Sequence, residues 1–234
     1  RILLLGNKGQ LGWELERVLL PLGDVTALDY PQINLADPEN IRRVVQGSKP
    51  NIILNATAYT NVDKAEEEPD LAMAVNGIGP GILAEEAEKL NAGLVHYSTD
   101  YVFDGKNDRP YTEEDVPNPI NVYGKTKRAG EEEVIRAGNA HLIFRTSWVY
   151  SLRRPNFVTK VLSWARQNET LKIVDDQTST PTWARVLAET TGLILAAGKY
   201  DLREFVKENH GIYHLVCEGS CNRFEWAKAI LALD

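Results

Sequence analysis

The chain has 234 residues and a formal net charge of −7; 43% of its residues are apolar and 25% are charged. This composition is typical of a globular protein that can bury a sizeable core. No block of Lys and Arg stands out, which argues against nucleic acid or an anionic membrane as the main partner. Because the chain shows no signal peptide and no apolar run long enough to cross a bilayer, we expect a cytoplasmic protein.

Neither the cysteines nor the histidines have the spacing of a metal site. Cys217 and Cys221 flank a short Glu-Gly-Ser turn with no further ligand beside them, so we expect two reduced thiols. The four histidines also lack metal-ligand spacing. They are His96, His141, His210 and His214. We therefore predict no metal ligands, and we expect His96, which lies within a strand, to be a core residue rather than a catalytic one.

Strand-like and helix-like segments alternate through the first half of the chain. The expected strands are Ile2–Gly6, Val25–Asp29, Asn51–Ala56 and Gly93–Thr99. The expected helices are Leu11–Leu20, Asp37–Gly47 and Pro69–Leu90, the last interrupted by glycines and a proline. An irregular stretch, Asp100–Pro119, follows. A loop this long in a compact domain is usually functional or disordered.

The second half is less regular. A helix that contains Tyr123 leads to the remaining expected elements, which are the strand His141–Ser147, the helix Phe157–Gln167, the strand Leu171–Val174, the helix Trp183–Ala197, the strand Ile212–Val216 and the helix Phe224–Leu233. This alternation predicts an α/β fold, a Rossmann-type doubly wound parallel sheet with helices on both faces.

We divide the chain into two parts. Residues 1–148 are expected to form a dinucleotide-binding domain, and residues 149–234 mainly a smaller substrate lobe over the carboxyl edge of the sheet, with some elements returning to that sheet. The chain starts at Arg1 without a methionine and stops at Asp234 inside an expected helix. We therefore expect both ends to be trimmed, and the C-terminus to be incomplete.

A glycine-rich turn joins the first strand to the first helix. The segment GNKGQLG places Gly6, Gly9 and Gly12 at that junction. Glycine permits a tight turn there and lets the backbone approach a pyrophosphate, while the helix N-terminus supplies amides. Any tight turn between a strand and a helix can use glycine, but this position favours a nucleotide-binding fold.

Asp29 ends the second strand about 20 residues beyond the glycine-rich turn, where an acidic residue commonly binds the adenosine ribose. A carboxylate there favours NADH, because it would repel the 2′-phosphate of NADPH. The alternative is an aspartate that only starts a turn before Pro31. The two interpretations have equal support from the sequence.

Tyr123 and Lys127 are one helical turn apart, so their side chains leave the same face of the expected helix. A phenol beside an ammonium makes a proton donor whose pKa moves toward neutrality, although surface helices also produce this pair by chance. Thr99 ends the fourth strand and points to the same carboxyl edge. A hydroxyl, a phenol and an ammonium beside a nicotinamide would make a carbonyl reductase.

Four segments carry a resemblance to a known family. They are GNKGQLG (6–12), STDYVFDG (98–105), NVYGKTKRAGE (121–131) and RTSWVY (145–150). Together they resemble the extended short-chain dehydrogenase/reductases and, within these, the dTDP-4-dehydrorhamnose reductases, which catalyse the last step of dTDP-L-rhamnose synthesis. The match runs in order through nearly the whole chain, and NATAYTNVDKAEEEP and YHLVCEG are also similar.

The resemblance implies a set of site residues. The family's catalytic residues fall on Thr99, Tyr123 and Lys127. Its dinucleotide contacts fall on Gly6, Gly9, Gln10, Leu11, Gly12, Asp29, Asn34, Leu35, Ala56, Ala58 and Tyr59, together with Tyr123 and Lys127. Its sugar contacts fall on Val62, Thr99, Asp100, Tyr101 and Trp148. Members use NADPH and often NADH, and several are associated with Mg²⁺.

The resemblance also implies a reaction, the reduction of the 4-keto group of dTDP-4-dehydro-L-rhamnose by NAD(P)H. Tyr123 is expected to donate the proton, Lys127 to lower the pKa of Tyr123 and bind the nicotinamide ribose, and Thr99 to orient the carbonyl. Trp148 and Tyr101 are expected to form apolar walls for the deoxysugar. We expect a monomer or a homodimer.

Two departures and two alternatives remain. Family members continue past Asp234 with an Arg-Pro element near the substrate nucleotide, and Asn34 stands where some relatives carry an aspartate near the adenine.

The enzyme alternative is a related sugar-nucleotide epimerase. The other is a non-catalytic regulatory subunit of the methionine adenosyltransferase type, against which the intact Thr99, Tyr123 and Lys127 argue.

Overall fold

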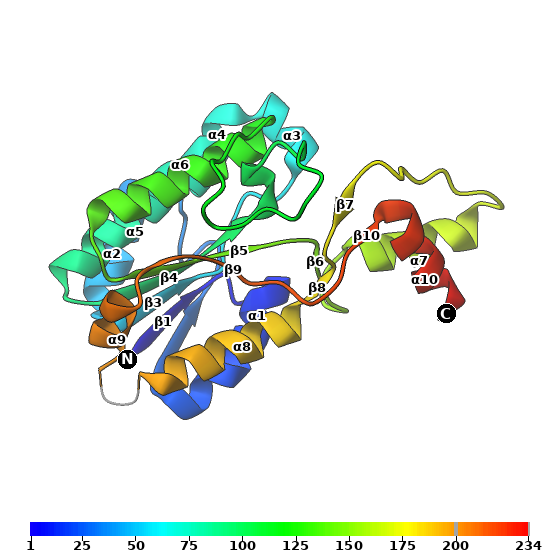
Figure 1. Cartoon of the computed structure of the whole chain (residues 1–234). Coiled ribbons are helices and arrows are strands. Elements are labelled where there is room, and N and C mark those ends of the chain that lie inside the picture. The colour runs from blue at the N-terminus through cyan, green and yellow to red at the C-terminus, as the bar shows by residue number, and fades with distance from the viewer. Residues whose placement is uncertain (199–200, 234) are drawn as a thin grey trace.

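The computed structural model describes residues 1–198 and 201–233, and a six-stranded parallel sheet lies at its centre (Figure 1). The strands follow the order β2-β1-β3-β4-β5-β9. They are β1 (Ile2–Leu5), β2 (Val25–Leu28), β3 (Ile52–Asn55), β4 (Gly93–Thr99), β5 (His141–Thr146) and β9 (Gly211–His214). The reversal of strand order beside β1 is that of a doubly wound sheet, so the predicted fold class is confirmed.

Helices cover both faces of the sheet (Figure 1). One face carries α2 (Pro38–Ser48), α5 (Gly79–Lys89) and α6 (Val122–Ala137), and the other carries α1 (Gln10–Leu19), α8 (Ala184–Ala197) and α9 (Leu202–Glu208). Each face of the sheet packs a hydrophobic core against its helices, and alternate strand residues point into one core or the other. Leu4 packs with Leu15 of α1 on one face, and Leu5 packs with Leu83 of α5 on the other. Burial on both faces explains why β1 is apolar throughout.

A smaller group of elements lies to one side of the sheet (Figure 1). It contains α7 (Phe157–Gln167) and α10 (Arg223–Ala232), which pack together, and two short strand pairs. In these pairs β6 (Val149–Tyr150) joins β8 (Thr182–Trp183), and β7 (Thr178–Ser179) joins β10 (Cys221–Asn222). Between them in sequence, α8 and β9 lie on the main sheet. The division of the chain at residue 148 stays a prediction.

Two expected elements differ from the observed ones. Residues Leu171–Val174 form no strand; they alternate between half-buried and exposed, and no strand of the described chain pairs with them. The expected helix Pro69–Leu90 is divided into α4 (Pro69–Met73), a π-helical turn (Ala74–Ile78) and α5. The wider turn accommodates Asn76, whose amide bonds the backbone of Tyr59 at both its N–H (2.8 Å) and its carbonyl (3.0 Å).

The remaining short elements surround the carboxyl edge of the sheet or connect larger ones. They are α3 (Val62–Glu67) and the 3₁₀ turns Leu20–Leu22 and Asp100–Val102.

The loop after residue 102 is anchored by Asp104, which accepts hydrogen bonds from Tyr111 (2.6 Å) and Asn118 (2.9 Å). The ring of Phe103 stacks on that of Tyr111 with centroids 4.3 Å apart. The irregular stretch is therefore an ordered loop. None of the described helices is long and apolar enough to cross a membrane.

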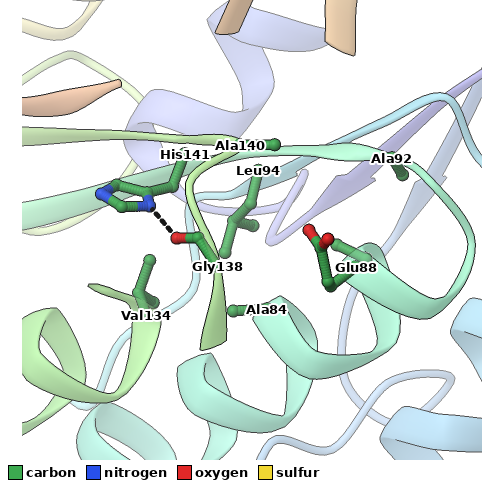
Figure 2. Close-up of a pocket in the computed structure, with 9 residues that line it drawn as sticks. Ala84, Glu88, Ala92, Leu94, Val134, Gly138, Ala140 and His141 are labelled. Atoms are coloured by element: carbon green, nitrogen blue, oxygen red, sulfur yellow. Dashed lines mark hydrogen bonds between the residues drawn. The ribbon is translucent and has the colours of Figure 1, made fainter. Parts of the chain in front are cut away.

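The opposite, amino edge of the sheet holds a small cavity between α5, α6 and the start of β5 (Figure 2). Its volume is about 10 Å³, room for one water at most. The Nδ1–H of His141 donates to the carbonyl oxygen of Gly138 over 2.8 Å beside it. Burial lowers the pKa of His141. This cavity is far too small for a dinucleotide.

Two helical glycines should respond oppositely to alanine. A Cβ at Gly130 of α6 would lie 2.1 Å from the carbonyl oxygen of Asn76, whereas a Cβ at Gly47 of α2 would meet nothing within 4 Å. Gly130→Ala should therefore cost about 1–3 kcal/mol of unfolding free energy through overpacking. Gly47→Ala should stabilise the protein by about 0.4–1 kcal/mol, because it reduces the entropy of the unfolded chain. Urea unfolding of both variants measures this, and equal effects would contradict the packing described.

Candidate active site

The glycine-rich turn is shaped by the close approach of its own backbone segments. Gly6 has a φ of +88°, and a Cβ there would lie 2.9 Å from the carbonyl oxygen of Ala56. A Cβ at Gly12 would lie 2.0 Å from the carbonyl oxygen of Gly6. The N–H of Gly9 donates to the same Gly6 oxygen over 3.0 Å. Only glycine fits at positions 6 and 12, and the turn brings the start of α1 against β1 and β3.

The start of α1 is suited to an anionic ligand. Its N-cap, Gly9, offers no side-chain hydrogen bond, whereas Asp37 caps α2 and Asn121 caps α6. The first-turn amides of α1 therefore have no side-chain partner at the cap, and the helix dipole favours a negative group beside them. These features fit the pyrophosphate of a dinucleotide. Leu11 is buried in the core below, so only its backbone faces this site.

Asp29 stands at the end of β2 beside this turn. Its carboxylate accepts the N–H of Lys8 over 2.9 Å and that of Tyr30 over 2.7 Å. The side chain therefore holds the turn, and it also lies next to the glycine-rich segment, where a ribose would bind. The turn role has support in these bonds, and the ribose-binding role stays a prediction.

Gln10 connects the turn to the segment after β5. Its Nε2 donates to the carbonyl oxygen of Val149 over 3.2 Å, and its Oε1 accepts from Ser151 (3.1 Å) and Asn156 (2.9 Å). The Nε of Arg154 donates to the carbonyl oxygen of Lys8 over 2.9 Å. These hydrogen bonds hold residues 149–156 against the glycine-rich turn, where we expect the pyrophosphate to bind.

The other candidate cofactor residues line the carboxyl ends of β2 and β3. Asn34 Oδ1 accepts the N–H of Ala36 over 3.1 Å, and Leu35 is buried. Ala56, Ala58 and Tyr59 follow β3 and are half-buried. The Tyr59 phenol donates to Glu68 over 2.7 Å, so its ring is fixed across the loop.

Thr99 and Tyr123 lie together at the end of β4. Thr99 is buried, and its hydroxyl donates to Asp100 over 3.1 Å and accepts the N–H of Tyr101 over 3.2 Å. Burial raises the pKa of Tyr123, opposed by a hydrogen bond with Thr99, while the nearby Asp100 and Tyr101 raise it further. Tyr123 is therefore protonated at neutral pH. The pKa of Tyr123 is thus raised, whereas the sequence led us to expect that Lys127 would lower it.

The Lys127 side chain is 1% exposed, and its ammonium points under the edge of the sheet. Its Nζ donates to the carbonyl oxygen of Tyr97 over 2.6 Å and lies 3.3 Å from Nε2 of His96. Burial lowers the pKa of Lys127 to about 8, opposed by the carboxylate of Glu131. The amine thus titrates close to neutral pH, as suits a group that exchanges a proton with its neighbours.

Asp100 and Tyr101 form the side of the site that faces the smaller group of elements. Burial raises the pKa of Asp100, and the hydroxyls of Ser179 (2.6 Å) and Thr99 oppose this shift by hydrogen bonding. The Tyr101 ring meets that of Tyr123 edge-on, with centroids 5.5 Å apart. The Arg223 guanidinium hydrogen-bonds Tyr101 and attracts Asp100, so α10 contributes a cation to the site.

Trp148 leaves the end of β5 with a φ of +40°, a left-handed conformation that is uncommon for a bulky residue. Its ring stacks on Trp226 with centroids 5.4 Å apart, and the guanidinium of Arg223 lies 3.7 Å from its centroid. Trp148 is half-buried, so part of it remains free to meet a ligand. Val62 is also half-buried and begins α3 near the same edge.

Sequence reasoning missed three residues of this site. Arg223 and Ser179 come from far along the chain, and only the fold brings them to Asp100. His96 was expected to be a core residue and is buried, but it also contacts Lys127. Its place in β4, three residues before Thr99, was the one available signal. Among the described residues, no group of three His, Cys, Asp or Glu side chains could hold a metal ion.

Comparison with known proteins identifies the family. The family model described as the RmlD substrate binding domain matches residues 1–234. The chain belongs to this family. It is 41% identical to the dTDP-4-dehydrorhamnose reductase of Escherichia coli K12, covering 98% of this chain and 76% of the relative. It is 42% identical to the reductase of the same name from Burkholderia thailandensis, covering 99% and 78%.

Solved structures of family members agree. The dTDP-4-dehydrorhamnose reductase of Clostridium acetobutylicum superposes with a TM-score of 0.91 at 36% identity, covering 99% of this chain and 79% of the other. That of Bacillus anthracis, determined in complex with NADP, gives 0.89 at 35%, covering 100% and 80%. The UDP-glucose 4-epimerase of Thermus thermophilus gives 0.80 at 20%, covering 99% and 82%, and shows the shared fold alone.

Trp148 and Trp226 provide a matched pair of substitutions in this site. Trp226 is 9% exposed and sits among Trp148, Tyr150 and Phe157, so Trp226→Ala should cost about 3–5 kcal/mol in stability. Trp148→Ala should cost less and should raise the KM for the sugar nucleotide, with NAD(P)H affinity nearly unchanged. Thermal melting and steady-state kinetics separate the two. A Trp148 variant with an unchanged KM and the larger melting loss would make Trp148 a packing residue only.

Proposed function

We propose that this protein reduces the 4-keto group of dTDP-4-dehydro-L-rhamnose with NADPH or NADH, the last step of dTDP-L-rhamnose biosynthesis. The observation that carries the proposal is the placement of Thr99, Tyr123 and Lys127 at the carboxyl edge of a sheet whose glycine-rich turn fits a pyrophosphate; Thr99 and Lys127 are buried and Tyr123 is half-buried. The relatives named as reductases of this sugar nucleotide cover nearly all of the chain.

The chemistry divides between cofactor and protein. When bound, the reduced nicotinamide supplies the hydride. Tyr123, kept protonated by burial, donates a proton to the developing alkoxide. The Thr99 hydroxyl orients the carbonyl oxygen. Lys127, with its pKa near 8, supplies a proton toward Tyr123 and binds the nicotinamide ribose.

The cofactor site in this proposal runs from the glycine-rich turn to Tyr59. Gly6, Gly9 and Gly12, with the backbone of Gln10 and Leu11, hold the pyrophosphate. Asp29 binds the adenosine ribose, Asn34 and Leu35 lie against the adenine, and Ala56, Ala58 and Tyr59 line the remainder. No step of the proposed mechanism needs Mg²⁺, and an assay in EDTA tests whether the ion contributes.

The substrate site in this proposal lies between the sheet edge and the smaller group of elements, residues 149–183 and 215–233. Val62, Thr99, Asp100, Tyr101 and Trp148 contact the sugar. The indole of Trp148 and the ring of Tyr101 give apolar area to the methyl-bearing face of a deoxysugar, worth about 25 cal/mol per Å² buried. Arg223 places a cation at the same site, which suits a diphosphate-linked substrate.

Steady-state oxidation of NAD(P)H with dTDP-4-dehydro-L-rhamnose tests the proposal. A reductase consumes one cofactor molecule for each sugar nucleotide reduced. A tightly bound cofactor that does not exchange would indicate an epimerase instead. Absence of turnover in a folded protein that binds the cofactor would indicate a regulatory subunit.

Tyr123→Phe should keep the fold and cofactor binding and lose most of the turnover. The variant removes the phenolic proton donor while retaining the ring that packs edge-on against Tyr101. General acid catalysis is typically worth about 10²–10⁴-fold, so kcat should fall by that factor. Measuring kcat together with NAD(P)H affinity decides the assignment, and a kcat close to that of the unaltered protein would reject it.

Asp29 should govern the choice between the two cofactors. Asp29→Ala should weaken NADH binding more than NADPH binding, because the carboxylate binds a ribose hydroxyl and repels a 2′-phosphate. Asp29→Asn is the matched control for the turn, since its amide oxygen can still accept one of the N–H groups of Lys8 and Tyr30. Equal losses for both cofactors in both variants would leave Asp29 as a turn residue. Fluorescence titration with each cofactor provides the dissociation constants.

A further inference from the structure

A chain of buried hydrogen bonds leads from β3 to the amine of Lys127. Asn55, His96 and Lys127 are 0%, 0% and 1% exposed, respectively. Asn55 Nδ2 lies 3.1 Å from Nδ1 of His96, and Nε2 of His96 lies 3.3 Å from Nζ of Lys127. The chain ends at the proposed catalytic amine, although neither Asn55 nor His96 has a part in the reaction described above.

The backbone of Thr57 fixes the direction of these bonds. Its N–H donates to Oδ1 of Asn55 over 3.1 Å, and its hydroxyl donates to the same atom. Because a backbone N–H can only donate, the Asn55 oxygen must face Thr57 and the Asn55 amide nitrogen must face His96. An amide nitrogen can only donate in turn, so Nδ1 of His96 must be the unprotonated, accepting nitrogen.

The tautomer of His96 then determines what Lys127 meets. A neutral imidazole that accepts at Nδ1 carries its proton on Nε2, and that N–H points at Nζ of Lys127. An ammonium has no lone pair to accept it, whereas a neutral amine has one. The amine can accept from His96 and still donate to the Tyr97 carbonyl over 2.6 Å. The network is fully satisfied only with Lys127 uncharged.

We propose that Asn55 and His96 are positioning residues that hold the Lys127 amine under the sheet edge and disfavour its ammonium form. The inference rests on the proposed function, because it gives Lys127 the role of exchanging a proton beside Tyr123. A proton carrier works best when it gains and loses its proton near the working pH. Burial alone acts in the same direction, and the His96 N–H adds to it at one defined atom.

The other charged groups around Lys127 leave room for this effect. Glu131, one turn along α6, favours the ammonium, but Arg145 of β5 pairs with its carboxylate over 2.8 and 2.7 Å and Arg128 over 3.1 Å. Tyr123 lies one turn earlier on α6 and is protonated. On β4, burial and then the charge of Lys127 hold the pKa of His96 well below its ordinary value. On β3, the facing side chain is the neutral Asn55.

Nitrogen NMR of the unliganded, ¹⁵N-histidine-labelled protein tests the tautomer. His96 should show the neutral form with the proton on Nε2 between about pH 6 and pH 9, without titrating. In Asn55→Asp, a carboxylate oxygen replaces the donor, so the His96 proton should move to Nδ1. A proton on Nδ1 in the unaltered protein, or a charged His96 in this range, would overturn the proposal. This readout does not depend on any substrate or on turnover.

The pH dependence of the NAD(P)H dissociation constant tests the effect on Lys127. The midpoint should lie near pH 8 in the unaltered protein. It should rise by about one pH unit in His96→Gln and in Asn55→Asp, because both variants can present an oxygen or a lone pair toward the ammonium.

His141→Gln is the matched control for this titration. His141 is also buried, at 4% exposed, but its Nδ1–H bonds Gly138 at the far edge of the sheet (Figure 2). It should lose stability without moving the midpoint. Unchanged midpoints in both test variants, or an equal shift in the control, would reject the inference. A protein that shows these shifts but does not reduce the sugar nucleotide would instead contradict only the proposed function.

Discussion

The close packing of α6 against the 3₁₀ turn after β4 and the π-helical turn before α5 is the constraint on which the candidate site depends. A Cβ at Gly124 would lie 2.1 Å from the carbonyl oxygen of Tyr101, and one at Gly130 would lie 2.1 Å from that of Asn76. These glycines let the helix approach until Lys127 passes below the end of β4 and Tyr123 reaches Thr99. The same approach removes water from both groups, and this is the main cause of their shifted pKa values. The packing that positions Tyr123 and Lys127 therefore also shifts their pKa values.

The sequence was sufficient to predict the sheet and most of its helices, because buried strands such as Ile2–Leu5 are apolar throughout and caps such as Asp37 mark helix starts. It was misleading at Leu171–Val174, where the pattern resembles a strand but no strand among residues 1–198 and 201–233 pairs with it. Local pattern predicts an element, whereas pairing depends on what the rest of the chain brings alongside.

The candidate site likewise contains residues that could be predicted from the sequence and contacts that could not. Thr99, Tyr123 and Lys127 could be found from spacing and from the resemblance, since each lies on a regular element whose direction is predictable. The contacts of Asp100 with Ser179 and Arg223 could not, because they join residues from distant parts of the chain. Lys127 shows a further limit. Its place on the helix was predictable, but its hydrogen-bond partners, the Tyr97 carbonyl and His96, were not, and the pKa of Tyr123 is raised by burial.

The central claim is that hydride passes from an exchangeable cofactor to the sugar, and transfer of a label measures this directly. NADPH carrying deuterium at both C4 positions of its dihydronicotinamide ring would be mixed with dTDP-4-dehydro-L-rhamnose and the protein. The account predicts one deuterium at C4 of the sugar for each NADPH oxidised, detected by mass spectrometry and NMR. A converted sugar that carries no deuterium, or that forms without loss of NADPH, would contradict it.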